Sequence, residues 1–257
     1  LFWHENPFGY HFTIFSFHLA CLSLVFFLCR RLIQSPKVSF ISALIFAVHP
    51  VHTEAVTYIS GRSDVICGFF IFLSFYFYLV FLNSTDPVRN NTPKVYALPS
   101  ARISNGAAKR KTLYLCGALF SYLVALFSKE VTLIFPLVIL FYSLYSSQSG
   151  KGRDFPSSPI SKNFLVISNI LFVSLAIAYL LFRYLFVKIQ PLHISLGRWY
   201  LFPKIFLFYL RLLVFPFGLH MQHSLKEADF LLQMPLFLSA LIFIVLIFAA
   251  IKFIKDR

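Results

Sequence analysis

The densest chemistry in the chain lies in residues 49–64, HPVHTEAVTYISGRSD, between two almost uninterrupted apolar runs. Histidine and glutamate are side chains that bind metals or move protons. However, His49, His52 and Glu54 lack the same-face i, i+4 histidine pair that makes a HExxH helix a strong zinc signature. We therefore expect no metal site here. Proton transfer and contact with a charged ligand remain open.

The same stretch ends with Arg62 and Asp64, which lead into the next apolar run. A structural turn at a membrane surface, in which Arg62 pairs with Asp64 or Glu54, explains these charges without any function. A functional interpretation is equally open, because a charge at membrane depth costs about 2.5 to 3.5 kcal/mol and marks a site or a paired contact.

Two more charged groups interrupt the apolar sequence. Lys129 and Glu130 follow Ser128 between two runs that carry no other charge, which indicates either a hairpin turn at the lipid surface or a polar mouth of a helix bundle. Guanidinium groups suit phosphate because their planar fork makes two charge-assisted hydrogen bonds, whereas an isolated lysine often only snorkels to lipid headgroups. The third group is made of Arg198, Lys204, Arg211 and His223.

Composition identifies the surroundings of these charges. The chain is 59% hydrophobic and 12% charged, with a mean hydropathy of +0.78, values far from those of a soluble domain. We therefore expect an all-α, polytopic transmembrane helical bundle. The four cysteines lie inside or at the ends of apolar runs and look like small buried hydrophobes, not like a disulfide or zinc framework.

A membrane-spanning helix needs about 20 predominantly apolar residues. The run at 36–49 is the weakest candidate, because it is short and begins at Pro36. A further run at 203–219 contains Arg211, and it is either another span or a helix lying at the membrane surface. The predicted spans are residues 10–29, 36–49, 64–82, 112–128, 131–147, 163–186 and 233–251.

Charge bias decides the topology, since short cytoplasmic loops collect Lys and Arg. If 203–219 does not cross, most of the 23 basic residues fall on one side, and all eight histidines fall on the other side or in the outer half of a span. We thus predict a single membrane domain over 1–257 with about seven spans, a cytoplasmic loop at 83–111, and an outer loop at 187–232 with an interfacial helix at 203–216. Because the cations flank spans, we expect membrane lipids and no nucleic acid as partners.

Four segments together resemble a known family. In order and spacing, they are similar to the membrane domain of protein O-mannosyltransferase-like glycosyltransferases that carry tetratricopeptide repeats. The resemblance covers nearly all of the chain, and HPVHTEAV followed by Gly61, Arg62 and Asp64 is its most specific part. The segments are NPFGYHFTIFSFHL, FAVHPVHTEAVTYISGRSDVICGFF, ALFSKEVTLIFPLVIL and YLRLLVFPFGLHMQHS.

The resemblance implies a GT-C type fold and transfer of a mannose-like sugar from a polyprenyl-phosphate donor to Ser or Thr of an acceptor protein. The reaction would take place on the luminal or periplasmic face, in an endoplasmic reticulum membrane or a bacterial plasma membrane. The lipid-linked sugar is the donor substrate, and no other cofactor is implied.

The resemblance also implies roles for individual side chains. Arg62, Arg211 and Lys129 would contact the donor phosphate. We expect the general base in an outer loop that precedes Leu1, with Glu54 and Asp64 as secondary candidates within the chain. The residues that would shape the cavity are His49, His52, Glu130 and His223.

Two other functions remain open at this point. A noncatalytic membrane anchor for a repeat scaffold would share the same spans without the chemistry. A transporter would also carry charges at membrane depth, but the chain shows no convincing internal symmetry of the kind that many transporters have.

Overall fold

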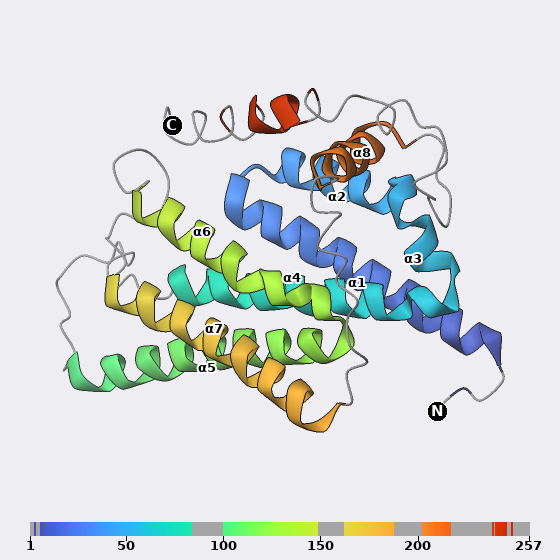
Figure 1. The fold of residues 1–257 in the computed structure, drawn as a ribbon. Coiled ribbons are helices and arrows are strands. Elements are labelled where there is room, and N and C mark those ends of the chain that lie inside the picture. Colours follow the sequence, from blue (N-terminus) through green and yellow to red (C-terminus); the bar gives the residue numbers. More distant parts are fainter. Residues whose placement is uncertain are drawn as a thin grey trace. The chain divides into compact units, whose positions relative to one another are not determined.

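A computed structural model describes Trp3 and residues 6–83, 100–148, 162–187, 202–216, 238, 240–245 and 248. Within these residues the regular structure is entirely helical, as predicted (Figure 1). The chain divides into two compact units, which are described separately. The first unit is residues 1–48 with 55–189, and the second is residues 49–54 with 190–257.

The first helix shows how local sequence sets the ends of an element. α1 runs from Pro7 to Ile33. The side chain of Asn6 caps it by accepting a hydrogen bond from the backbone N–H of Phe8 at 3.0 Å, and proline suits the first helical position because its missing N–H is not needed there. The helix ends at Gln34, whose positive φ of 60° breaks the helical path.

The remaining elements of the first unit follow a simple up-and-down course. Short 3-10 turns and the five-residue helix α3 separate the longer helices near residues 49–61. The elements and their bounds are α2 (Pro36–Val48), η1 (Pro50–His52), α3 (Thr53–Thr57), η2 (Ile59–Gly61), α4 (Arg62–Asn83), α5 (Ser100–Ser128), η3 (Glu130–Ile134), α6 (Phe135–Gln148) and α7 (Lys162–Phe186). Of these, η1 and the start of α3 belong to the second unit.

Four helices in the described residues are long and apolar enough to cross a membrane, and α2 with the bent segment after it makes a possible fifth. The protein is therefore a multi-pass integral membrane protein. The predicted spans at 10–29, 64–82, 112–128 and 163–186 coincide with α1, α4, α5 and α7, which have the length and the hydropathy that a crossing requires.

The other predicted spans differ from their helices. The span at 36–49 contains a helix of 13 residues, because prolines stand at its start and just beyond its end. The span at 131–147 begins with the 3-10 turn η3, which leaves a shorter apolar helix. α5 begins at Ser100, so the last part of the stretch predicted as the loop 83–111 is helical. The span at 233–251 lies mostly outside the described residues.

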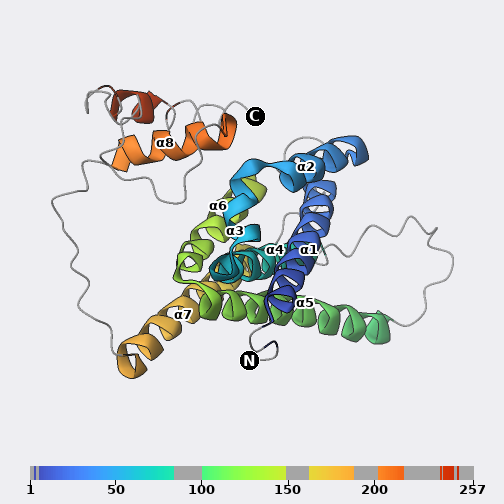
Figure 2. The ribbon, with the colours of Figure 1, turned by 90° about the vertical axis from the view of Figure 1, so that its right-hand side faces the viewer.

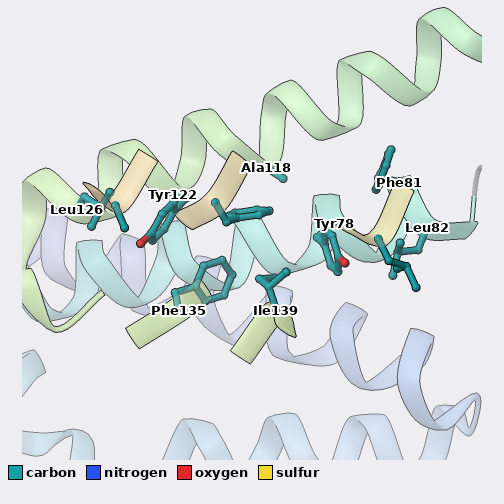
Figure 3. Packing of buried hydrophobic residues seen from close by; sticks show 11 residues of the cluster. Tyr78, Phe81, Leu82, Ala118, Tyr122, Leu126, Phe135 and Ile139 are labelled. Carbon is teal, nitrogen blue, oxygen red and sulfur yellow. The ribbon is translucent and has the colours of Figure 1, made fainter. Parts of the chain in front are cut away.

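The core of the first unit is formed by α4, α5, α6 and α7 (Figure 3). Phe172 of α7 is fully buried, and its ring centre lies 5.5 to 5.9 Å from the rings of Tyr78, Tyr122 and Phe135, one on each of the other three helices. The buried cluster consists of Tyr78, Phe81, Leu82, Ala118, Tyr122, Leu126, Phe135, Ile139, Leu165, Phe172 and Ala176.

Buried hydroxyl groups connect the same helices. Ser74 of α4 donates to the backbone carbonyl of Ala118 in α5 at 2.7 Å. Ser143 of α6 lies 2.8 Å from the hydroxyl of Tyr78 in α4 and accepts from the side-chain amide of Asn169 in α7 at 3.0 Å. Because lipid is as apolar as the packed side chains, such close packing and hydrogen bonds hold membrane helices together.

The second unit contains α8, from Phe202 to Val214, which covers most of the range predicted to form an interfacial helix. The rings of Phe202 and Phe206 lie 5.7 and 4.9 Å from that of Phe243, so α8 packs beside the helical turn at 240–245 (Figure 2). Its position at a membrane surface, and the single-domain organisation, stay predictions.

Candidate functional site

One end of the first unit collects the charges that stood out in the sequence. We name it the site end: it contains the first turns of α1 and α4, the last turns of α5 and α7, and η3. In Figure 1 these termini lie toward the right of the view, and the opposite termini of the same helices lie toward the left. Both described carboxylates of the first unit, Asp64 and Glu130, belong to the site end.

Arg62 opens α4 at the site end. Its guanidinium carbon lies 5.3 Å from the centre of the Tyr10 ring in the first turns of α1, a cation–π contact. Within the described residues Arg62 forms no ion pair, so the structural alternative of an Arg62 pair with Asp64 or Glu54 is not what is observed. The half-buried guanidinium has no carboxylate partner among the described residues.

Asp64, in the first turn of α4, pairs instead with Lys129, which lies in the turn between α5 and η3. The two side chains are 42% and 43% exposed. The backbone fixes this turn firmly, since the carbonyl of Lys129 accepts from both the N–H and the hydroxyl of Thr132, at 3.3 and 2.8 Å. The buried hydroxyl of Thr132 therefore holds Lys129 in place for its contact with α4.

Glu130, the next residue, reaches the other way and pairs with Arg183 of α7. Adjacent residues of one turn thus tie α4 and α7 to the end of α5. Sequence reasoning did not select Arg183 or Tyr10. Arg183 had a usable signal, because it is the only charged side chain in the apolar run 164–186. Tyr10 had none, because it lies among many aromatic residues.

The remaining candidates divide between the second unit and the undescribed part of the chain. His49, His52, Glu54 and Arg211 belong to the second unit. The rings of His49 and His52 lie 6.2 Å apart, and Nε2 of His49 lies 2.9 Å from the carbonyl oxygen of Leu213, near the end of α8. Glu54 is exposed in the first turn of α3. The last candidate, His223, lies outside the described residues.

The described residues thus hold two sets of polar groups. One set, at the site end, has a cation over an aromatic ring and two ion pairs. The other has a histidine bound to the end of α8, the helix that carries Arg211. No three His, Cys, Asp or Glu side chains are grouped so as to hold a metal ion in the part of the chain that the structure describes.

Comparison with known proteins found relatives over part of the chain. Protein O-mannosyl-transferase TMTC4 of Homo sapiens is 54% identical over 46 residues, 18% of this chain and 6% of that protein. Protein O-mannosyl-transferase TMTC3 of Mus musculus is 42% identical over 73 residues, 28% of this chain and 8% of that protein. Protein O-mannosyl-transferase tmtc2 of Xenopus laevis is 42% identical over 74 residues, 29% of this chain and 9% of that protein.

The matched part of the chain spans less than a tenth of the length of each of these relatives. No family model and no solved structure matches the chain. The predicted resemblance is nevertheless confirmed over part of the chain: up to 29% of its length is similar to protein O-mannosyl-transferases.

Proposed function

We propose that this protein transfers a mannose-like sugar from a polyprenyl-phosphate donor to Ser or Thr side chains of proteins, on the luminal or periplasmic face of its membrane. The sequence similarity to protein O-mannosyl-transferases supports the reaction class. The location proposed is an endoplasmic reticulum membrane, or the plasma membrane if the source is bacterial. The cations of the site end, Arg62 and Lys129, support a donor that carries a phosphate.

The contact between Arg62 and Tyr10 is the observation that carries the proposal. Sugar transfer leaves negative charge on the departing lipid phosphate, so a catalyst gains from donors aimed at that phosphate. Arg62 stays charged at any relevant pH, and an aromatic ring orients it without neutralising it. A carboxylate partner in the same place would compete with the phosphate. We assign Arg62 the main donor-phosphate contact.

Lys129 is the second proposed phosphate contact at the site end, and its pair with Asp64 is compatible with that role. Ion pairs between exposed side chains contribute only about 0.2 to 1 kcal/mol, so an incoming phosphate can replace the carboxylate at small cost. The exchange would release Asp64, which then becomes available to accept the proton of an acceptor hydroxyl. Asp64 and Glu54 are therefore kept as candidates for the general base.

Arg211 is the proposed phosphate contact of the second unit, with His52 and His223 shaping the cavity. Glu130 has a different part in this proposal. Because it is held by Arg183, it stabilises the Lys129 turn and does not act on the substrate directly.

The test compares two arginines in the same kind of contact. Arg31 lies 5.0 Å from the ring centre of Tyr76, at the opposite end of the first unit from Arg62. Each is replaced by alanine, and transfer of radiolabelled mannose from polyprenyl phosphate to a Ser- and Thr-containing peptide is measured in membranes. Losing a charge-assisted contact of about 1.5 to 3 kcal/mol predicts a fall of about 10- to 150-fold in kcat/KM for Arg62→Ala.

The matched control, Arg31→Ala, should keep transfer within about twofold of wild type, because it removes the same cation–π contact away from the site end. Both variants should insert into the membrane normally. Unchanged transfer in Arg62→Ala would refute the assignment of Arg62, and equal losses in both variants would mean that the arginines act on helix packing alone.

A further inference from the structure

The imidazole of His49 contacts two backbone groups of the second unit. The backbone N–H of Val51 donates to Nδ1 at 3.2 Å, which caps the start of η1. Nε2 lies 2.9 Å from the carbonyl oxygen of Leu213 in α8. The ring thus connects two segments that are 164 residues apart in the sequence.

The two contacts determine where the ring carries its hydrogen. A backbone N–H can donate only to a bare nitrogen, so Nδ1 has no hydrogen. In a neutral imidazole the hydrogen is then on Nε2, which donates to the carbonyl of Leu213. Both ring nitrogens are occupied by backbone groups. His49 therefore has no nitrogen left to bind a metal or to transfer a proton.

Leu213 is the penultimate residue of α8. The last four carbonyls of a helix have no partner within that helix and are met by side chains, water or other groups. We propose that His49 is the C-terminal cap of α8 and, through it, a positioning residue for Arg211, which lies two residues before Leu213 in the chain. In this proposal His49 does not line the cavity or touch the substrate.

The faces of α8 show why its rotation matters. Phe202, Phe206, Tyr209 and Leu213 form an exposed apolar stripe, with 40% to 62% of each side chain accessible. Arg211 and Lys204 are seven residues apart and share another face, which also contains the buried ring of Phe208. Fixing the end of α8 holds the helix at one rotation, and with it the face that carries Arg211. The link from Arg211 to a donor phosphate rests on the proposed function, but the cap does not.

Two amide substitutions separate the two contacts of the ring. In His49→Asn the short side chain can still cap Val51, because asparagine is a good N-cap, but it cannot reach Leu213. In His49→Gln the longer amide can reach Leu213 but no longer matches the capping geometry. Hydrogen exchange at the amides of Val51 and of Phe215, which donates to the carbonyl of Arg211, is measured on the protein in lipid nanodiscs.

We expect exchange at Phe215 to become about 5- to 30-fold faster in His49→Asn and to stay near the wild-type rate in His49→Gln. At Val51 we expect exchange to stay near the wild-type rate in His49→Asn and to become faster in His49→Gln. Amides in the middle of α5 should not change in either variant. A wild-type exchange rate at Phe215 in His49→Asn would overturn the cap.

A second measurement does not need a variant to fold. The nitrogen-15 spectrum of the wild-type protein should show His49 with a bare Nδ1 and a protonated Nε2, and the opposite tautomer would overturn the proposal. In the transfer assay, His49→Asn should raise KM for the donor about 5- to 30-fold with little change in kcat, and His49→Gln should restore it. A faster exchange at Phe215 without a change in KM would refute the positioning role while leaving the cap intact. Absence of transfer in the wild-type protein would count against the proposed function and leave the exchange result unaffected.

Discussion

Ser143 is the meeting point of three helices in the first unit, and the cost of removing it can be worked out atom by atom. Its hydroxyl donates to the carbonyl of Ile139 in its own helix at 2.7 Å. Since its one hydrogen is used there, the Tyr78 hydroxyl must donate to it, and the Asn169 amide donates to it as well. Ser143 is therefore an acceptor shared by α4 and α7.

This arrangement predicts unequal effects for the two partners. Tyr78→Phe removes one hydrogen bond and leaves Ser143 still bonded, so it should cost about 0.6 kcal/mol, the average for bonds between membrane helices. Ser143→Ala removes both bonds between helices and takes the acceptor from the buried hydroxyl of Tyr78, whereas the amide of Asn169 keeps its bond to the carbonyl of Leu165 at 2.7 Å. At about 1 to 3 kcal/mol for an unsatisfied buried group, the loss should be several times larger.

Unfolding free energies measured in bicelles by steric trapping would test the prediction. The matched control is Ser16→Ala: its hydroxyl bonds to the carbonyl of Phe12 within α1 on an exposed face, so the free energy of unfolding should change by less than about 0.5 kcal/mol. If Tyr78→Phe costs as much as Ser143→Ala, Ser143 is not the shared acceptor and the reasoning fails.

Three more predictions concern the two ends and the core of the first unit. Reversing one charge, Asp64→Lys, should destabilise the site end. Adding Lys129→Asp should recover about 0.2 to 1 kcal/mol of the free energy of unfolding in a double-mutant cycle, and less at high salt. No coupling between the two substitutions would mean that the pair is not formed. Phe172→Ala should lower the unfolding free energy by about 3 to 5 kcal/mol because it leaves a cavity between four helices. Phe172→Leu should cost less than half as much. Small and similar losses in both variants would contradict the packing described. Three basic residues precede the predicted span 112–128: Lys109, Arg110 and Lys111. Neutralising them should alter topology or expression more than transfer, as glycosylation-site reporters would detect, and lost transfer with normal topology would contradict this.

Much of the candidate site was recognisable in the sequence because charges are conspicuous in an apolar chain. Arg62, Asp64, Lys129 and Glu130 all belong to the site end, as the charge-based topology requires. Their pairing was not recognisable. One of the two open interpretations paired Arg62 with Asp64 or Glu54, but the partner of Asp64 is Lys129, 65 residues further along the chain.

The expected role of His49 changed for a similar reason. Its residue type suggested proton transfer or contact with a charged ligand, and the family resemblance implied a place in the wall of a cavity. The structure places its ring between Val51 and Leu213, and the second contact spans 164 residues. The turn at Pro50 and its cap depend on neighbouring residues, whereas the motif HPVH contains no information about the helix that arrives from the far end of the chain.

By itself the sequence determined the membrane class, the helices α1, α4, α5 and α7, and the grouping of Arg62, Asp64, Lys129 and Glu130 at one end. These properties depend on hydrophobicity and charge summed over neighbouring residues, which do not require knowledge of the fold. Only the tertiary structure decided which face of each helix packs and which charges meet. Lipid-facing and core-facing positions are equally apolar in these helices, so periodicity does not reveal their rotation, and the rotation is set by close contacts such as Phe172 against three neighbours.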